Sequence, residues 1–251
     1  SLEKIIVLPD VLDETRWLGG RIPFVDKEKM VLSFIAATDP DYIVNTKLVG
    51  PEELKNYLDI LNPKWKGKIV MNDPTTAGSG LKWFGLVVRE LLGPEKGKEY
   101  MRNLAKQEPA ITRDQRLQMD WVALGKYAIA IAPQRELVDE FQKLGAPIKP
   151  LELFESTDIS PGSGNVALIN RAPHPNAARL FINWLLTKEG QTSYVKVFGS
   201  PSARLDVSKE GLDPSTIPDP KGKYFIPTEA FYLGQTEMRE LAVEIFGPLL
   251  K

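Results

Sequence analysis

Cysteine is absent from this sequence, and histidine occurs once, at His174. Without cysteine the chain forms no disulfide, uses no thiol nucleophile and binds no metal through thiolates. One histidine also disfavours a serine–histidine triad or a histidine-rich metal site within this chain. We therefore expect no metal centre and no resident cofactor.

Net charge and long apolar runs are lacking as well. Lys and Arg together number 32 and Asp and Glu 33, a net charge of −1. This balance gives no general attraction for nucleic acid or anionic membranes. No apolar run approaches the roughly 20 residues of a membrane span. The sequence does not open with basic residues followed by an apolar stretch, the pattern of a signal peptide. We therefore expect that the chain is cytosolic or that its targeting segment was removed beforehand.

The 251 residues, 43% of them hydrophobic, suit two modest globular lobes. Apolar runs and turn residues predict strands at 29–37, 41–45, 68–71, 127–132, 148–153 and 166–169. Helices are expected from 51 to 61, 79–92, 96–105, 114–124, 136–144, onward from 176, and 229–246. Alternation of strands and helices between 54 and 170 favours an α/β fold with a parallel or mixed sheet. Ligands of such sheets collect at the carboxyl ends of strands.

The segment after residue 175 carries an apolar stripe at helical spacing. Its members are Ala177, Leu180, Phe181, Trp184 and Leu185. We interpret this stripe as part of a hydrophobic core rather than as a binding surface.

The turn DPTTAGSG, Asp73 to Gly80, follows the strand at 68–71 and precedes a helix. Its free backbone N–H groups and the hydroxyls of Thr75, Thr76 and Ser79 favour a carboxylate or phosphate at the helix start. It is not a Walker loop, because Gly80 is followed by Leu-Lys, and it lacks the dinucleotide fingerprint. The alternative is a plain strand–helix turn capped by Ser79.

Two further groups of residues could reach the same edge of the sheet. Arg113 and Arg116 stand at the start of the helix at 114–124, and arginine pairs bidentately with carboxylate or phosphate. We favour Arg113, which lies at the junction of loop and helix; a solvated arginine is the alternative for each. Gln134 and Arg135 follow the strand YAIAIA.

Five sequence segments occur in this order along the chain: LDILNPKWKGKIVMNDP, LGKYAIAIAP, ISPGSGNVALIN, APHPNAARLFINWLLTKEGQ and SPSARLDV. Together they resemble extracellular solute-binding proteins of iron(III)/polyamine/thiamine-type ABC importers. The resemblance implies a type II periplasmic binding fold, with two α/β lobes joined by crossing strands and ligand in the cleft. One crossing would lie near Tyr42–Asn45 and the return near Asn165–Ile169, giving lobes of 1–43 plus 166–251 and 44–165.

The sequence departs from the family pattern in two ways. It begins after the strand–helix units that open the first lobe in the family, so that lobe is expected to be incomplete. Exposed sheet edges and apolar surface would then invite pairing with another chain or a homodimer. In addition, Pro133-Gln134-Arg135 stands where ferric-binding relatives carry adjacent tyrosines, which disfavours iron binding through phenolates.

The resemblance implies a periplasmic or extracellular binding protein, either free or membrane-tethered, that delivers a small anionic solute to an ABC permease. It would not be an enzyme. Ser163 and Asn165 would face the cleft or form a hinge turn. The expected ligand-binding residues are Tyr42, Asp73, Thr75, Thr76, Gly78, Ser79, Gly80, Arg113, Gln134, Arg135, Ser163 and Asn165. The alternatives are an enzyme adapted from this fold and a truncated interaction protein.

Overall fold

Two units divide the chain, and the computed structural model describes residues 2–4, 8–154, 157–160, 164–219, 222 and 224–250. Unit 1 comprises residues 1–39 and 158–232, and unit 2 comprises residues 40–157 and 233–251. We expected 233–251 in the first lobe. The segment instead belongs to unit 2, because Met238, Ala242 and Phe246 join the hydrophobic core of that unit.

Unit 2 contains a five-stranded mixed sheet. Its order is β6 (Ala110–Thr112), β5 (Ile69–Asn72), β7 (Ile129–Ile131), β4 (Tyr42–Asn45) and β8 (Ile148–Leu151). Strand β5 is parallel to β6 and β7, whereas β4 is antiparallel to β7 and β8. The mixed α/β sheet predicted from the alternation of strands and helices is confirmed.

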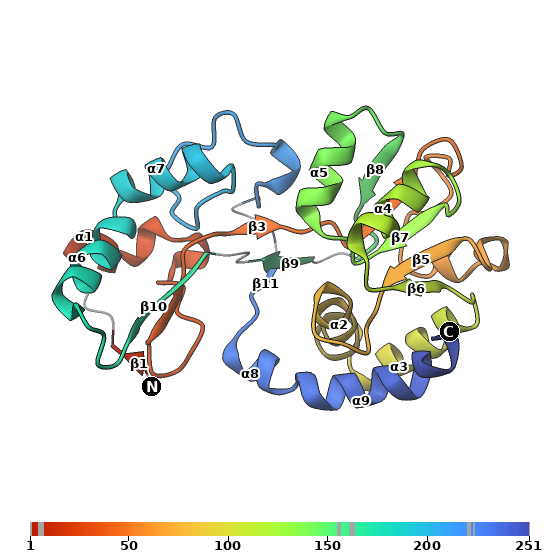
Figure 1. Cartoon of the computed structure of the whole chain (residues 1–251), viewed down its shortest axis with the longest axis horizontal. Coiled ribbons are helices and arrows are strands. Elements are labelled where there is room, and N and C mark those ends of the chain that lie inside the picture. Colours follow the sequence, from red (N-terminus) through yellow and green to blue (C-terminus); the bar gives the residue numbers. More distant parts are fainter. Residues whose placement is uncertain are drawn as a thin grey trace. The chain divides into compact units, whose positions relative to one another are not determined.

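Both faces of this sheet are apolar, which explains the uninterrupted hydrophobic runs of its central strands. Ile43, Val70 and Ala130 face a core shared with α4 (Gln115–Ala123) and α5 (Arg135–Lys143). Their sequence neighbours face the opposite core, as the period of two in a strand requires. That second face is covered by α2 (Ser79–Gly85), its π-helical continuation Leu86–Leu91, α3 (Pro94–Ala105) and α9 (Gln235–Phe246) (Figure 1).

Unit 1 is built on two three-stranded sheets. The first has the order β1 (Leu2–Glu3), β10 (Asn165–Ile169) and β2 (Val31–Ser33). The second has the order β11 (Tyr224–Phe225), β9 (Thr157–Ser160) and β3 (Ala37–Thr38). The helices assigned to this unit are α1 (Pro9–Leu12), α6 (Pro175–Leu185), α7 (Lys188–Phe198) and α8 (Glu229–Leu233), the last reaching one residue past the boundary.

The strand expected at 29–37 is two strands in different sheets. Strand β2 pairs with β10, and β3 pairs with β9. Between them the backbone bonds elsewhere: the Phe34 N–H donates to Gly164 O, and the Ala36 N–H donates to Pro201 O. The apolar run 29–37 is therefore continuous in sequence, although its backbone changes from one partner strand to another. No residue in the run indicates where this change occurs.

The helix expected from 51 to 61 is wrong, since this segment forms turns and a short 3-10 helix at Asp59–Leu61. Side chains take the N–H groups that an α-helix would use. The Asp59 carboxylate accepts from the N–H groups of Lys55 and Asn56, and the Asn56 side chain accepts from Leu58 N–H. Such local bonds compete with helix formation.

The helix expected at 229–246 is interrupted. Helix α8 ends at Leu233, and α9 begins at Gln235, with Gly234 between them. The two pieces belong to different units, since Phe231 lies in the part assigned to unit 1, whereas Met238 joins the hydrophobic core of unit 2.

The apolar stripe at 177–185 is largely exposed, so its assignment to the core is wrong for most of its members. Leu185 is buried, together with Ile182, but Leu180 is 74% exposed, Phe181 56% and Trp184 40%. Helix α6 is therefore apolar on two sides, of which the unit 1 core covers only one. Like every helix in the described ranges, it is too short to cross a membrane.

Candidate ligand-binding site

The carboxyl ends of β5, β6 and β7 lie at one edge of the unit 2 sheet, because these strands are parallel. The turn 73–78 follows β5, Arg113 and Asp114 follow β6, and residues 132–134 follow β7. Polar groups that the sequence separates by some 60 residues therefore meet at this edge, where α/β sheets commonly bind ligands.

Asp73 is the buried anchor of the turn, 2% exposed. Its Oδ1 accepts from the backbone N–H of Thr75 at 2.8 Å and from the Thr75 hydroxyl at 2.6 Å. Its own N–H donates to Thr112 O of β6 at 3.0 Å. Burial acts to raise the pKa of Asp73, but the bonds from Thr75 and Arg113 outweigh it, so the pKa lies below its usual value. The carboxylate is thus held ionised.

Arg113 is bound to this carboxylate on one side only. Its Nε donates to Asp73 Oδ2 at 2.8 Å, while the side chain as a whole is 70% exposed. Its two Nη atoms have no hydrogen bond to any part of the chain that the structure describes. A guanidinium fixed through Nε presents its remaining N–H groups as a fork for a carboxylate or phosphate.

Asn72 and Gly80 close the start of α2 against the end of β5. The Gly80 N–H donates to Asn72 Oδ1 at 3.1 Å, and Asn72 Nδ2 donates to Thr112 O at 3.2 Å. A Cβ on Gly80 would lie 2.5 Å from Asn72 O and 2.7 Å from Asp73 O. Only glycine fits this close contact between helix and strand.

Ser79 does not cap helix α2; the cap residue is Gly78. The Ser79 side chain instead connects the end of β5, the residue after β7 and the start of α4. Its hydroxyl has one proton for two acceptors, Ala132 O at 2.8 Å and Asn72 Oδ1 at 3.2 Å. It also accepts from Gln115 Nε2 at 2.8 Å. Gln115 Oε1 in turn accepts from the Gln134 N–H at 3.0 Å. The network fixes the edge of the sheet and leaves the Ser79 hydroxyl little capacity for a ligand.

Arg116 and Arg135 are already paired. Arg116 donates to both carboxylate oxygens of Glu140, at 2.9 and 3.2 Å. Arg135 lies 3.6 Å from Asp139, one turn further along α5. The Gln134 side chain is exposed beside the network. Of the three arginines, Arg113 therefore presents the guanidinium with the most unused donors.

Thr76, Ala77 and Gly78 form the outer part of the turn. Thr76 is half-buried, and Ala77 and Gly78 are exposed. Within the described residues, no acceptor is found for their backbone N–H groups. The Thr75 hydroxyl is directed to Asp73 instead. The turn thus presents backbone donors beside the Arg113 guanidinium.

Two of the predicted residues, Tyr42 and Asn165, take no part in this hydrogen-bond network. Tyr42 is 1% exposed in the unit 2 core, with its ring edge-on to Trp83 at 6.0 Å, and burial raises the pKa of its phenol well above the usual value. A ligand contact through Tyr42 is not compatible with that burial. Asn165 belongs to unit 1, where it is exposed and pairs with Ser33 across β10 and β2. Ser163 lies outside the described residues.

Asn72 and Gln115 are the polar residues of the network that sequence reasoning missed. Both stand beside residues that it selected, Asp73 and Arg113, but neither belongs to a recognisable motif. Their roles depend on the adjacency of β5, β6 and β7, which one sequence does not specify. In the described part of the chain, His, Asp and Glu side chains form no group of three that could hold a metal ion.

The sequence profile of the bacterial extracellular solute-binding proteins matches residues 28–196, more than half of the chain. An uncharacterized protein of Haemophilus influenzae is 25% identical over 198 residues, which are 79% of this chain. The chain spans 56% of the length of that relative.

Solved structures share the fold. Iron-bound HitA from Pseudomonas aeruginosa is 19% identical, with a TM-score of 0.71 over 97% of this chain and 76% of HitA. AfuA from Actinobacillus pleuropneumoniae, with fructose-6-phosphate bound, is 19% identical, with a TM-score of 0.66 over 98% of this chain and 76% of AfuA. With the profile match, these folds make the chain a member of the bacterial extracellular solute-binding proteins.

Proposed function

We propose that this chain is the solute-binding component of an ABC importer and that it captures a small anionic solute for delivery to a membrane permease. The solute contacts the carboxyl ends of β5, β6 and β7. Its anionic group pairs with the Nη atoms of Arg113 and with the backbone N–H groups of 76–78. Binding without turnover is the activity, as expected for this family, and the location is periplasmic or extracellular.

The observation that carries the proposal is the geometry of Arg113. Its Nε is held at 2.8 Å by the buried carboxylate of Asp73, while 70% of the side chain is exposed. An arginine so oriented loses less freedom on binding an anion than a free surface arginine would. A backbone turn with unused N–H groups beside it suits the same charge.

The solved relatives support two kinds of ligand. AfuA is described with fructose-6-phosphate, whose phosphate matches the donors around Arg113. HitA is described with iron, but the chain has Pro133, Gln134 and Arg135 where the resemblance to ferric-binding proteins implies adjacent tyrosines. We therefore favour a phosphate or carboxylate ligand over a bare ferric ion.

The test is calorimetric titration with fructose-6-phosphate, citrate, inorganic phosphate, spermidine and Fe(III). One of the anions is expected to bind with 1:1 stoichiometry. Replacing Arg113→Ala removes charge-assisted hydrogen bonds worth about 1.5–3 kcal/mol, or roughly 10- to 150-fold in affinity. Arg113→Lys keeps the charge but not the fork and is expected to lie between the two.

Arg116→Ala provides the matched control, because Arg116 is a neighbouring exposed arginine already paired with Glu140. Its affinity for the anion is expected to stay within about twofold. Binding of spermidine or Fe(III) alone would refute the anionic solute, and an unchanged affinity in Arg113→Ala would refute the assigned contact.

The proposed partners include a second copy of the chain. The exposed stripe of α6, formed by Ala177, Leu180, Phe181 and Trp184, supports this part of the proposal. Large exposed apolar patches on globular proteins commonly mark interaction surfaces. A two-fold axis would place the same stripe on both copies, since such interfaces are self-complementary.

A further inference from the structure

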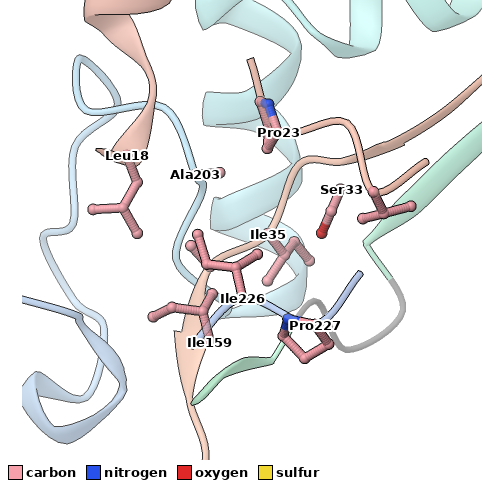
Figure 2. A pocket seen from close by; sticks show the side chains of 10 residues that line it. Leu18, Pro23, Ser33, Ile35, Ile159, Ala203, Ile226 and Pro227 are labelled. Carbon is pink, nitrogen blue, oxygen red and sulfur yellow. The ribbon is translucent and has the colours of Figure 1, made fainter. Parts of the chain in front are cut away.

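Two pockets of the molecule differ in the room that they offer. The first lies between the two sheets of unit 1, where Ile35, Ile159 and Ile226 line it (Figure 2), and its volume of about 20 Å³ suits one water molecule. The second lies wholly within unit 2 and has a volume of about 300 Å³. That volume is at the lower end of the range for small-molecule sites, so the unit 2 pocket has room for a small organic ligand.

One side of the unit 2 pocket is apolar. Tyr57, Leu58 and Leu61 come from the segment before β5, Leu92 follows the π-helical turn, and Tyr100 belongs to α3. The Tyr100 side chain is buried and meets the Tyr57 ring edge-on, with ring centres 5.6 Å apart. Aromatic and branched aliphatic groups pack well against such a wall.

Hydrogen bonds and ring stacking hold this wall in place. Gln107 Nε2 donates to Leu61 O at 2.8 Å, and the Asp59 carboxylate accepts from two backbone N–H groups of its own segment. The Tyr57 ring stacks on Phe154, with ring centres 4.8 Å apart. The pocket is therefore formed before a ligand arrives, which reduces the entropic cost of binding.

The other side of the pocket is polar and comes from one face of α3. Lys96, Glu99 and Asn103 line it, and their spacing of three and four residues makes them neighbours on the helix surface, with Cβ atoms about 5–6 Å apart. In the described part of the chain, neither the Lys96 ammonium nor the Glu99 carboxylate takes part in an ion pair or hydrogen bond. One cation and one anion are therefore available next to each other at the edge of an apolar pocket.

We propose that this pocket binds a free α-amino acid with an apolar side chain. The carboxylate of the amino acid pairs with Lys96 and its ammonium group with Glu99, while its side chain packs against Tyr57, Leu61 and Leu92. An α-amino acid carries its two opposite charges on groups attached to one carbon, which matches the adjacent charges on α3. A simple anion or cation would meet one like charge there and is disfavoured. This site does not depend on the anion site at the carboxyl ends of β5, β6 and β7 or on its proposed function.

The probe for this site is L-phenylalanine. Phenethylamine and 3-phenylpropanoate are comparison compounds that lack its carboxylate and its ammonium group, respectively. Protein labelled with ¹³C at the leucine methyl groups is titrated with each compound. Phenylalanine is expected to shift the methyl signals of Leu58, Leu61 and Leu92. Each comparison compound is expected to bind about 2- to 5-fold more weakly, because it lacks one exposed ion pair.

Two charge-removing variants test the two contacts separately. Lys96→Met is expected to weaken phenylalanine and phenylpropanoate about 2- to 5-fold without weakening phenethylamine. Glu99→Gln is expected to weaken phenylalanine and phenethylamine by the same factor without weakening phenylpropanoate. Lys98→Met and Glu95→Gln, on the same helix but outside the pocket lining, are the matched controls and are expected to change each affinity by less than about twofold.

Arg113→Ala separates this pocket from the anion site, because the shifts caused by phenylalanine are expected to persist in that variant. The proposal is overturned if phenylalanine leaves all three leucine signals unmoved or if the shifts disappear in Arg113→Ala. It is also overturned if both comparison compounds bind as tightly as phenylalanine, which would mean a pocket that accepts apolar groups regardless of charge. Equal loss of affinity in Lys96→Met and Lys98→Met would likewise overturn it.

Discussion

Arg204 is a buried guanidinium at the centre of unit 1, with no exposed side-chain surface. It donates to both oxygens of Asp206 at 2.9 Å, to Asp10 Oδ2 at 3.1 Å and to Leu186 O at 3.0 Å. Its guanidinium carbon lies 5.5 Å from the centre of the Trp17 ring. Such a charge is tolerated in a core because its donors are matched by carboxylates.

Asp206 makes the stability of unit 1 dependent on pH. The hydrogen bond from Arg204 lowers the pKa of Asp206 below its usual value, against the effect of burial. A lowered folded-state pKa contributes stability above about pH 4, which is lost as the pH falls through the folded value. Asp206→Asn is expected to cost about 1–2 kcal/mol at pH 7 and clearly less at pH 3, measured by urea unfolding at both pH values.

The control for this prediction is Glu237→Gln at an exposed position on α9. It is expected to change the free energy of unfolding by less than about 0.5 kcal/mol. A cost of Asp206→Asn that is equal at pH 7 and pH 3 would contradict the role assigned to the ionised pair.

Sequence reasoning grouped residues that the structure brings together, but it assigned the Ser79 hydroxyl to the wrong partner. Asp73 and Arg113 do meet at the predicted edge of the sheet. Ser79, however, bonds to Ala132 O and Gln115 instead of capping α2. These partners lie 53 and 36 residues away in the sequence, and their adjacency follows from strand order, which local pattern does not encode.

At the scale of the secondary-structure elements, the junction of β5 and α2 requires a glycine at position 80. The nearest heavy atom to a Cβ on Gly80 would be Asn72 O at 2.5 Å, a backbone atom that a rotamer change cannot move. Gly80→Ala is expected to cost about 1–3 kcal/mol in the free energy of unfolding, as overpacking does, and to weaken anion binding by shifting the turn 73–78. Chemical denaturation and calorimetric titration measure the two effects.

Gly247→Ala is the matched control for Gly80. A Cβ at that position lies 3.7 Å from the Val243 side chain, and the backbone is already helical. The free energy of unfolding is expected to stay the same or rise by up to about 1 kcal/mol. Equal destabilisation by both substitutions would show that the contact with Asn72 O is not the cause.

Helix α6 provides a second prediction at this scale, one that rests on the proposed association of two copies. Leu180→Glu places a charge in the exposed stripe, on a side chain that is 74% exposed. Self-association measured by light scattering is expected to fall at least tenfold, while the free energy of unfolding changes by less than about 0.5 kcal/mol. Leu124→Glu, at the end of α4 where the leucine is 85% exposed, should leave association unchanged. A wild-type chain that is monomeric at high concentration would refute this interface.

The sequence patterns were most informative for central strands and least for surface segments. The strands of unit 2 are apolar on both faces, so their runs are unmistakable. Segment 51–61 has helical spacing of Leu54, Leu58 and Leu61, yet the Asp59 carboxylate captures its N–H groups. In α6, periodicity identified the helix but not which of its two apolar sides is covered.

At the scale of the whole molecule, α9 belongs to unit 2, so a mutation in the core face of α9 is expected to destabilise unit 2 first. Phe246 is fully buried against unit 2, with its ring edge-on to Phe84 at 6.2 Å. Phe246→Ala is expected to cost about 3–5 kcal/mol. Hydrogen exchange monitored by mass spectrometry is expected to accelerate in β5 and β7 before it changes in β10.

Phe198→Ala is the control for the same chemical change at a side chain that is 61% exposed. Its cost is expected to be below about 1 kcal/mol. Faster exchange in β10 than in β5 upon Phe246→Ala would instead support the lobe boundaries inferred from resemblance, in which the C-terminal segment belongs with the first lobe.

The chain passes between its two units three times, near residues 39, 157 and 232. An odd number of passages leaves the start of the chain in unit 1, at β1, and its last helix in unit 2, at α9. Fluorophores attached close to the two ends of this sequence would therefore sit on different units. Energy transfer between them would report any relative movement of the units when a solute binds.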